Sequence, residues 1–225
     1  MGYDELSRIN PGVVMVRAPA FGLTGPWRER PGYAVTMEAV AGMTWLTGYA
    51  DGDPVAPSNP GDPLAGAHAT LALLIALEHR RRTGRGMLVE APMIGALLNV
   101  ASEQVVEHSK YGRLIERSGN RGPSAIPQNL YLSADLDDQG RQDRWVAIAV
   151  ENDEQWSGLC AALADEEEST DLESLATRGA RAAAHDQIDS RLSAWCAGRS
   201  STDIVEALWS HRVPVGIVML PHEQD

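Results

Sequence analysis

The stretch that most constrains the fold is residues 61–91, which reads GDPLAGAHATLALLIALEHRRRTGRGMLVEA. Side chains at helical spacing over residues 63–82 predict a long helix with one largely apolar face. Asp62 fits the N-cap of that helix, and Pro63 fits its first position, where the missing N–H costs no hydrogen bond. Residues 87–91 then predict a strand. The positions on the apolar face are Leu64, His68, Leu71, Leu74 and Ile75.

The segments on either side continue an alternation of helices and strands, which favours an α/β fold. Strands are predicted at residues 13–17, 145–150 and 213–220, where apolar residues run between turn signals. Further helices are predicted at residues 4–9, 34–47, 93–109, 153–163, 171–178, 184–197 and 201–211. The candidate buried positions of the helix at 34–47 are Val35, Met37, Ala41 and Trp45.

Charge and composition exclude several classes of protein. The net charge of −12 argues against a nucleic-acid partner, although a local basic pocket could still hold an anionic small molecule. The longest apolar runs fall short of the roughly 18 residues that a membrane span requires, and the first residues do not resemble a signal peptide. Cys160 and Cys196 therefore predict reduced thiols in a cytoplasmic protein, with no metal site. The acidic segment at 165–173 is expected to be solvated.

Several stretches carry a resemblance that extends over nearly the whole chain. In order, they are Phe21-Gly-Leu-Thr-Gly-Pro, Arg30-Pro-Gly-Tyr, Glu38-Ala-Val-Ala-Gly-Met, Gly61-Asp-Pro-Leu-Ala-Gly, Val89-Glu-Ala-Pro-Met, Gly119-Asn-Arg-Gly-Pro, Trp145-Val-Ala-Ile-Ala-Val-Glu-Asn-Asp and Val213-Pro-Val-Gly-Ile-Val. Their order and spacing resemble the family III CoA-transferases, which include formyl-CoA and carnitinyl-CoA transferases. The α-methylacyl-CoA racemases share the fold of this family.

The resemblance implies an α/β fold in two parts. Residues 1–115 would form a portion of a Rossmann-like large domain that carries the catalytic aspartate. Residues 116–225 would form a linker with a glycine loop, followed by a smaller α/β domain. Because members of the family are usually longer, the resemblance also implies that the chain is truncated at its N-terminus and at its C-terminus.

The resemblance gives Asp62 the role of the nucleophile in an acyl-CoA transferase. In similar enzymes this carboxylate attacks the thioester of an acyl-CoA to form a mixed anhydride and then an aspartyl-CoA thioester. A helix N-terminus suits this role, since it favours negative charge and its N–H groups can hold an oxyanion. Coenzyme A enters as acyl-CoA substrate, and no permanently bound cofactor is implied. The alternative is that Asp62 only caps the helix.

Other positions match residues that contact the substrates in similar enzymes. Arg30 and Met93 match positions near CoA, where the alternatives are a solvated arginine and a core methionine. Tyr33, Gly119 and Gly122 match positions around the reacting acyl group, where the glycines could equally belong to ordinary turns. His68, on the apolar face of the long helix, fits a hydrogen-bonded core histidine better than a catalytic base.

Two departures from the family pattern affect the expected chemistry. Racemases of this fold pair the aspartate with a histidine where this chain has Tyr33, and tyrosine, with a pKa of about 10, is a poor base near neutral pH. Many transferases place an acidic residue where Ala34 stands here, which puts activity in doubt. A non-catalytic subunit of a hetero-oligomer is therefore the alternative to an active transferase. Either reading implies a homodimer, or a second chain that supplies an N-terminal region.

Overall fold

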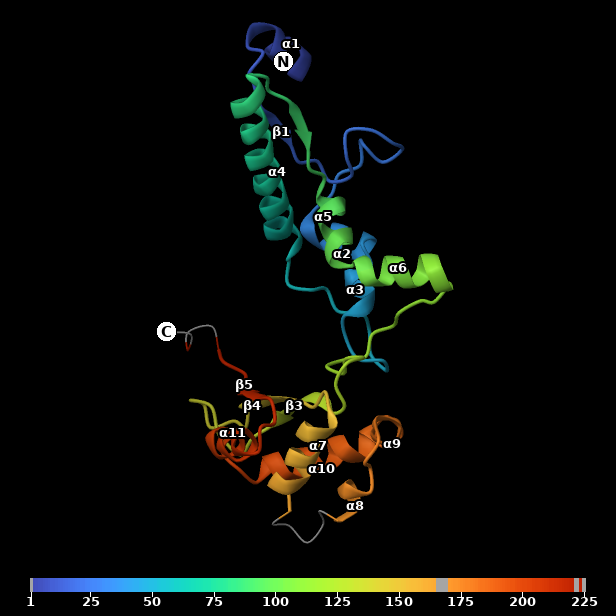
Figure 1. The fold of residues 1–225 in the computed structure, drawn as a ribbon, viewed down its shortest axis with the longest axis vertical. Coiled ribbons are helices and arrows are strands. Elements are labelled where there is room, and N and C mark those ends of the chain that lie inside the picture. The colour runs from blue at the N-terminus through green and yellow to red at the C-terminus, as the bar shows by residue number, and fades with distance from the viewer. Residues whose placement is uncertain (1, 165–169, 221–222, 224–225) are drawn as a thin grey trace. The chain divides into compact units, whose positions relative to one another are not determined.

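The chain divides into two compact units, which are described separately (Figure 1). The computed structural model describes residues 2–164, 170–220 and 223. Unit 1 comprises Met1–Gly119 and unit 2 comprises Asn120–Asp225. Part of the acidic segment, residues 165–169, lies outside the described residues, so its predicted solvation stays a prediction.

Unit 1 combines a parallel pair of strands with helices. Its elements are α1 (Tyr3–Ile9), β1 (Met15–Arg17), α2 (Ala34–Val40), α3 (Met43–Leu46), α4 (Gly61–Thr83), β2 (Leu88–Glu90), α5 (Met93–Val100) and α6 (Ser102–Tyr111). Strands β1 and β2 run parallel, with Val16 opposite Val89, and α4 lies in the crossover between them. The predicted long helix followed by a strand is thus confirmed. Gly84 ends α4 in the left-handed conformation, which glycine adopts without a steric penalty.

Two helices that the sequence predicts as continuous are interrupted. Gly42 has a φ of 81° and separates α2 from α3, which the sequence analysis joined. Ala101, with a φ of −87° and a ψ of 20°, separates α5 from α6. Met37 and Ala41 are buried as predicted. Val35 and Trp45 are 50% and 40% exposed, so the prediction that these two side chains are buried is wrong.

The core of unit 1 is small. Its fully packed apolar cluster consists of Met37, Ala41 and Leu97, with partly buried neighbours around it. Leu64 of α4 packs against this cluster, whereas Leu71 and Leu74 further along the helix are 59% and 57% exposed. The buried side of α4 is instead formed by small residues such as Ala65 and Ala76, which let neighbouring elements approach closely.

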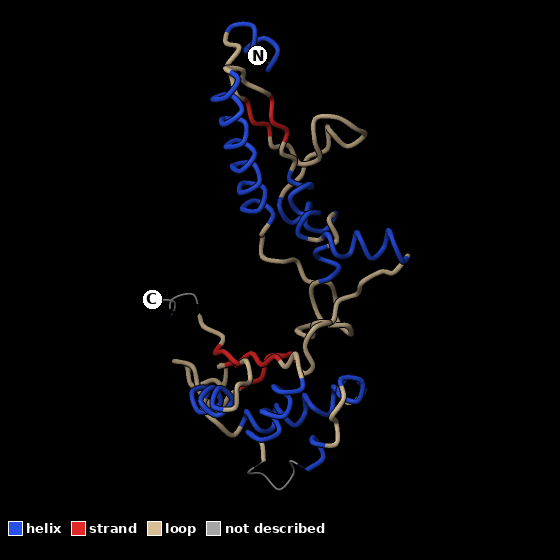
Figure 2. Tube along the Cα trace, viewed as in Figure 1, coloured by secondary structure: helices blue, strands red, loops and turns tan. Residues whose placement is uncertain are grey.

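Unit 2 is an antiparallel sheet with helices on one side (Figure 2). The strand order is β3-β4-β5, and both pairs of strands are antiparallel. In β4, Val146 and Ile148 are buried while Trp145 and Ala147 are exposed, as expected for a sheet that packs on one face. The elements of unit 2 are β3 (Gln128–Leu132), β4 (Trp145–Ala149), α7 (Asp153–Ala162), α8 (Thr170–Glu173), α9 (Arg178–Ala183), α10 (His185–Ala197), α11 (Ser201–Ser210) and β5 (Val215–Ile217).

The core of unit 2 is large and continuous. It joins the inner face of the sheet to α7, α10 and α11, with Trp156, Leu192 and Ile204 among its buried members. The sequence pattern did not predict β3. It predicted one helix over 171–178, where the structure has α8 and α9 separated by a loop, and a last strand that is longer than β5. Among the described residues, the structure contains no helix of the length and apolarity that a membrane span requires.

Candidate active site

Asp62 lies in the first turn of α4, but it does not cap the helix. The helix begins at Gly61 and its N-cap is Pro60, so the prediction that Asp62 is the N-cap is wrong. The reason is the backbone of Pro60, whose φ of −68° and ψ of −12° already lie in the helical region. The carboxylate still lies at the positive end of a 23-residue helix. It is exposed, and it makes no hydrogen bond or ion pair with another described residue.

The backbone N–H groups of this first turn are largely occupied. The amide of Gly61 donates to Glu38 Oε1 at 3.0 Å. Pro63 has no N–H, and the amide of Leu64 donates at 3.1 Å to the carbonyl of the N-cap residue. The amide of Asp62 donates to no other residue in the described part of the chain. It is therefore the one N–H of the turn that could hold an oxyanion beside the carboxylate.

The helix α2 packs against the start of α4. Ala34 and Glu38 lie one turn apart on α2, and both are buried, at 8% and 0% exposure. A Cβ atom added to Gly61 would lie 3.3 Å from the Cβ of Ala34 and 3.3 Å from Glu38 Oε1. Position 34 therefore has no acidic side chain, but Glu38, one turn further along α2, places a carboxylate next to Gly61, the residue before Asp62.

The two residues predicted to contact CoA lie around the same core. Met93 is half-buried and packs against the cluster that contains Met37. Arg30 is exposed, and its guanidinium lies 4.8 Å from the ring centre of Trp27. Trp27 makes an edge contact at 5.3 Å with Phe21, which packs against the same cluster as Met93. Continuous contacts therefore connect the positions of Arg30 and Met93 within unit 1.

Tyr33 and His68 flank this region. Tyr33 is the N-cap residue of α2, and its side chain is 79% exposed, while its carbonyl accepts from the Met37 amide at 2.9 Å. The phenol is therefore open to a ligand, and its substrate role stays a prediction. His68 Nδ1 lies 2.8 Å from the Leu64 carbonyl, and Nε2 lies 3.1 Å from Asn99 Nδ2. The expectation of a hydrogen-bonded histidine is confirmed.

Both glycines of the predicted glycine loop have packing reasons to lack a side chain. Gly119 has a φ of 63°, and an added Cβ would lie 2.5 Å from the Tyr49 ring. An added Cβ at Gly122 would lie 2.5 Å from Gln128 Oε1. Gly119 belongs to unit 1 and Gly122 to unit 2. Their proposed place around the acyl group stays a prediction.

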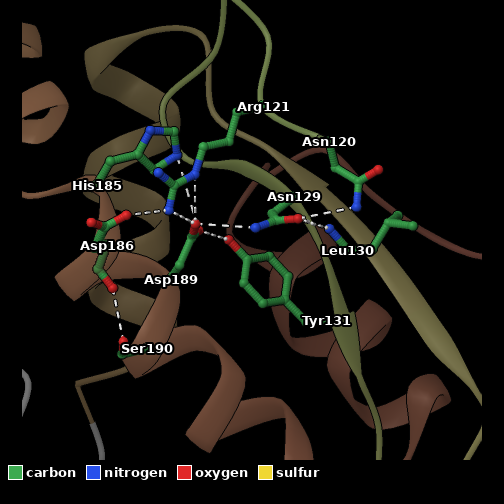
Figure 3. Close-up of polar contacts among 9 residues, drawn as sticks. All are labelled: Asn120, Arg121, Asn129, Leu130, Tyr131, His185, Asp186, Asp189 and Ser190. Atoms are coloured by element: carbon green, nitrogen blue, oxygen red, sulfur yellow. Dashed lines mark hydrogen bonds and ion pairs between the residues drawn. The ribbon is translucent and has the colours of Figure 1, made fainter. Parts of the chain in front are cut away.

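The side chains between these glycines are held by a buried carboxylate of unit 2 (Figure 3). Asp189, on α10, accepts from Arg121 Nε at 3.0 Å, from Asn129 Nδ2 at 3.1 Å and from Tyr131 Oη at 2.6 Å. Asn120 Nδ2 donates to Asn129 Oδ1 at 3.3 Å. The loop residues Asn120 and Arg121 are thus tied to β3 and α10 at the same point.

The charges of this cluster are well defined. Burial raises the pKa of Tyr131, and the hydrogen bond to Asp189 raises it further, so the phenol stays protonated. Burial opposes the charge of Arg121, but hydrogen bonds to Asp189 and Asp186 outweigh it and raise its pKa. Burial lowers the pKa of His185, whose Nε2 lies 4.0 Å from Asp189 Oδ1. Asp189 is therefore a carboxylate surrounded by donors.

The sequence analysis assigned no role to Glu38, Asp189, Asn129 or Tyr131. Glu38 lies within one of the quoted motifs, but its contact with Gly61 depends on how two helices pack. Asn129 and Tyr131 lie on β3, a strand that was not predicted, so their approach to α10 had no signal in the sequence. Asp189 was placed on a predicted helix without an indication of which face is buried.

Comparison with known proteins places these features in a family context. A family model described as CoA-transferase family III matches residues 1–224. The succinyl-CoA–D-citramalate CoA-transferase of Chloroflexus aurantiacus is 30% identical over 224 residues, which are 99% of this chain and 54% of that protein. The beta subunit of succinyl-CoA–L-malate CoA-transferase from the same organism is 30% identical over 220 residues, 95% of this chain and 52% of that protein.

The solved structures give the same picture of the fold. A CAIB/BAIF family protein from Brucella suis matches with a TM-score of 0.82 and 26% identity, over 99% of this chain and 57% of that one. The chain thus spans about half the length of the relatives it matches. The similarity covers unit 1 and unit 2 alike.

Proposed function

The chain belongs to CoA-transferase family III, and on this premise we propose that it moves CoA between carboxylic acids with Asp62 as the nucleophile. The observation that carries the proposal is the position of Asp62. Its exposed carboxylate lies in the first turn of a 23-residue helix and has no partner among the described residues. A nucleophile needs this combination of negative charge, access and freedom from a competing ion pair.

The proposed reaction has four steps, and it converts one CoA thioester into another without hydrolysis. The Asp62 carboxylate attacks the donor thioester, which forms a mixed anhydride and releases CoA thiolate. The thiolate attacks the aspartyl carbonyl, which forms an aspartyl-CoA thioester and releases the donor acid. The acceptor carboxylate then attacks this thioester, which forms a second anhydride and releases CoA thiolate again. Finally the thiolate attacks the acceptor carbonyl, which releases the new acyl-CoA and restores Asp62.

The other residues that the family resemblance assigns to substrate contacts have supporting roles in this proposal. Arg30, exposed and stacked on Trp27, would pair with a CoA phosphate, and Met93 would border the path of CoA from the side of the core. Tyr33 would contact the acyl group without acting as a base, which favours acyl transfer over the proton transfer of a racemase. Gly119 and Gly122 would leave room for the reacting acyl group.

We also propose that unit 1 functions with a second chain, either a copy of this one or a different subunit. Several large apolar side chains of unit 1, including Leu71, Leu74 and Ile75, are more than half exposed. Contiguous apolar surface of this kind is typical of interfaces. Two of the similar proteins are named alpha and beta subunits of one CoA-transferase. A non-catalytic role within such an assembly is the second candidate function, and we place either activity in the cytoplasm.

The test is an assay of CoA transfer with succinyl-CoA and L-malate, the substrates in the names of similar proteins. The chain is assayed alone and with candidate second subunits, and malyl-CoA is measured by mass spectrometry. Asp62→Ala should reduce transfer to below about one thousandth, as loss of a nucleophile does in other enzymes. Asp203→Ala is the matched control, because Asp203 is also an exposed carboxylate in the first turn of a helix. Undiminished transfer by Asp62→Ala would contradict the proposal.

A further inference from the structure

Glu38 is a buried carboxylate whose role the proposed reaction does not explain. Its side chain has 0% exposure, although charged residues are rarely buried without a partner of opposite charge. Its Oε1 atom accepts from the Gly61 amide at 3.0 Å. Its Oε2 atom is buried and has no hydrogen-bond partner in the described part of the protein.

The other buried carboxylate, Asp189, shows what a purely structural acid looks like in this chain. Asp189 accepts hydrogen bonds from Arg121, Asn129 and Tyr131, so the charge is neutralised and its oxygens are used. Glu38 has one neutral donor. An apolar side chain of similar volume would avoid the cost of burying a carboxyl group that has only one hydrogen-bond partner. Stability alone therefore does not account for an acid at this position.

The one hydrogen bond that the Glu38 side chain makes in the described part of the chain comes from the residue that precedes the candidate nucleophile. Gly61 is the first residue of α4 and precedes Asp62. An amide at this position has no partner within the helix, so Glu38 supplies the acceptor that the helix lacks. Because Pro60 is the N-cap and offers no side-chain oxygen, the first turn has no local cap. The hydrogen bond from Gly61 to Glu38 therefore anchors the start of α4 to α2.

We propose that Glu38 is a positioning residue for Asp62. Its carboxylate fixes the Gly61 amide and so sets the direction in which the next residue presents its side chain and its own N–H. Gly61 lacks a side chain because a Cβ atom there would lie 3.3 Å from Ala34 and from Glu38 Oε1. The close packing of α2 on the start of α4 and the hydrogen bond are thus parts of one arrangement. This inference rests on the proposed role of Asp62.

Two conservative variants of Glu38 distinguish the effect of its side-chain length from the effect of its charge. Glu38→Gln keeps the length of the side chain and an acceptor oxygen but removes the charge. Glu38→Asp keeps the charge but withdraws the acceptor from the Gly61 amide by one methylene. We expect Glu38→Gln to retain kcat within about threefold. We expect Glu38→Asp to lower kcat by about 10- to 100-fold with a smaller change in KM, since a misplacement of about 1 Å can cost a hundredfold in rate.

Gln104→Ala is the matched control within unit 1. Gln104 Nε2 donates to the Ala41 carbonyl at 3.0 Å, so it also joins two segments through one side chain to backbone hydrogen bond. That bond ends at the other end of α2. The variant should lower thermal stability without changing kcat. If Glu38→Asp and Gln104→Ala lower activity only in proportion to the loss of folded protein, the positioning role is wrong.

Hydrogen exchange of the Gly61 amide, followed by NMR, tests the inference without the reaction. The amide should be protected in the wild type and in Glu38→Gln, and should exchange faster in Glu38→Asp. Full activity of Glu38→Asp, or equal impairment of both Glu38 variants, would overturn the inference while leaving Asp62 as the nucleophile. Absence of transfer in the wild type, with the expected exchange pattern, would instead overturn the proposed reaction.

Discussion

Cys160 and Cys196 are buried thiols in the core of unit 2. Burial raises the pKa of Cys160 to about 11 and that of Cys196 to about 12. Since the thiolate is the reactive form, we predict that neither cysteine reacts with a thiol reagent in the native protein at pH 8. Labelling should occur only as fast as unit 2 opens, and it should become rapid in denaturant. Fast labelling of the folded protein would contradict this burial.

The same pKa shifts predict a loss of stability at high pH. The ordinary thiol pKa is 9.0, and both folded values lie above it. The stabilising contribution is therefore complete below pH 9 and is lost as the pH rises towards 11, because the unfolded thiols ionise first. The free energy of unfolding, measured in urea from pH 8 to pH 10.5, should fall less steeply for the double variant Cys160→Ala, Cys196→Ala.

Asp189 and Asp186 both bind Arg121, but their side chains differ in exposure, at 12% and 92%. Replacing Asp189 by alanine leaves the buried Tyr131 hydroxyl without this acceptor and removes the more buried of the two carboxylates that bind Arg121, so we predict a loss of about 3–5 kcal/mol in the free energy of unfolding. Asp186→Ala should cost less than about 1 kcal/mol, since exposed ion pairs contribute little. Urea unfolding followed by tryptophan fluorescence measures both. Equal losses would show that burial does not set the strength of the cluster.

The functional residues were only partly predictable from the sequence. Asp62 could be placed at the start of a long helix, because the apolar spacing and the arginines at its end mark that helix. Its exact cap position could not be predicted, since Pro60 and Pro63 are both acceptable near a helix start. Glu38 gave no signal, because its role depends on the packing of α2 against Gly61.

At the scale of elements, the apolar face of α4 is the main difference between prediction and structure. The spacing of Leu71, Leu74 and Ile75 is that of a helix face in contact with other elements. In the structure these side chains are 57–62% exposed. The pattern indicates a helix face that packs against other residues, but it cannot tell whether that contact lies within the described chain or elsewhere.

This face leads to a prediction about assembly. If a second chain covers it, the wild type should sediment as a dimer or a larger species. The triple variant Leu71→Gln, Leu74→Gln, Ile75→Gln should sediment as a smaller species, because it removes apolar area from the contact. Leu136→Gln is the control, since Leu136 is 61% exposed in unit 2 and should not affect assembly. Sedimentation of the wild type as a folded monomer, both alone and when mixed with candidate second subunits, would contradict the proposed partner.

In other elements the sequence pattern does not predict where a helix breaks or where a strand lies. Gly42 and Ala101 break two predicted helices, although glycine and alanine both occur within helices and neither had to mark a break. The strand β3 begins with Gln128 and Asn129, whose polar side chains hid the strand within a polar segment. By contrast β4 was predicted, because Val146 and Ile148 alternate with neighbours on the other face.

At the scale of the whole molecule, the two units differ in how completely they bury their apolar residues. Unit 2 has a continuous core that joins its sheet to its helices, whereas the fully buried cluster of unit 1 contains Met37, Ala41 and Leu97. The family and its α/β fold could be inferred from ordered motifs, but the incomplete core of unit 1 required the structure.

The central claim is that Asp62 becomes acylated during CoA transfer. The most direct measurement is to incubate the protein with succinyl-CoA, with and without a candidate second subunit, and to add hydroxylamine. Hydroxylamine converts an aspartyl anhydride or thioester into a stable hydroxamate, which peptide mass spectrometry can locate. We predict a hydroxamate on Asp62 that is absent in Asp62→Ala and unaffected in Asp203→Ala. A preparation that transfers CoA while Asp62 remains unmodified would contradict the account.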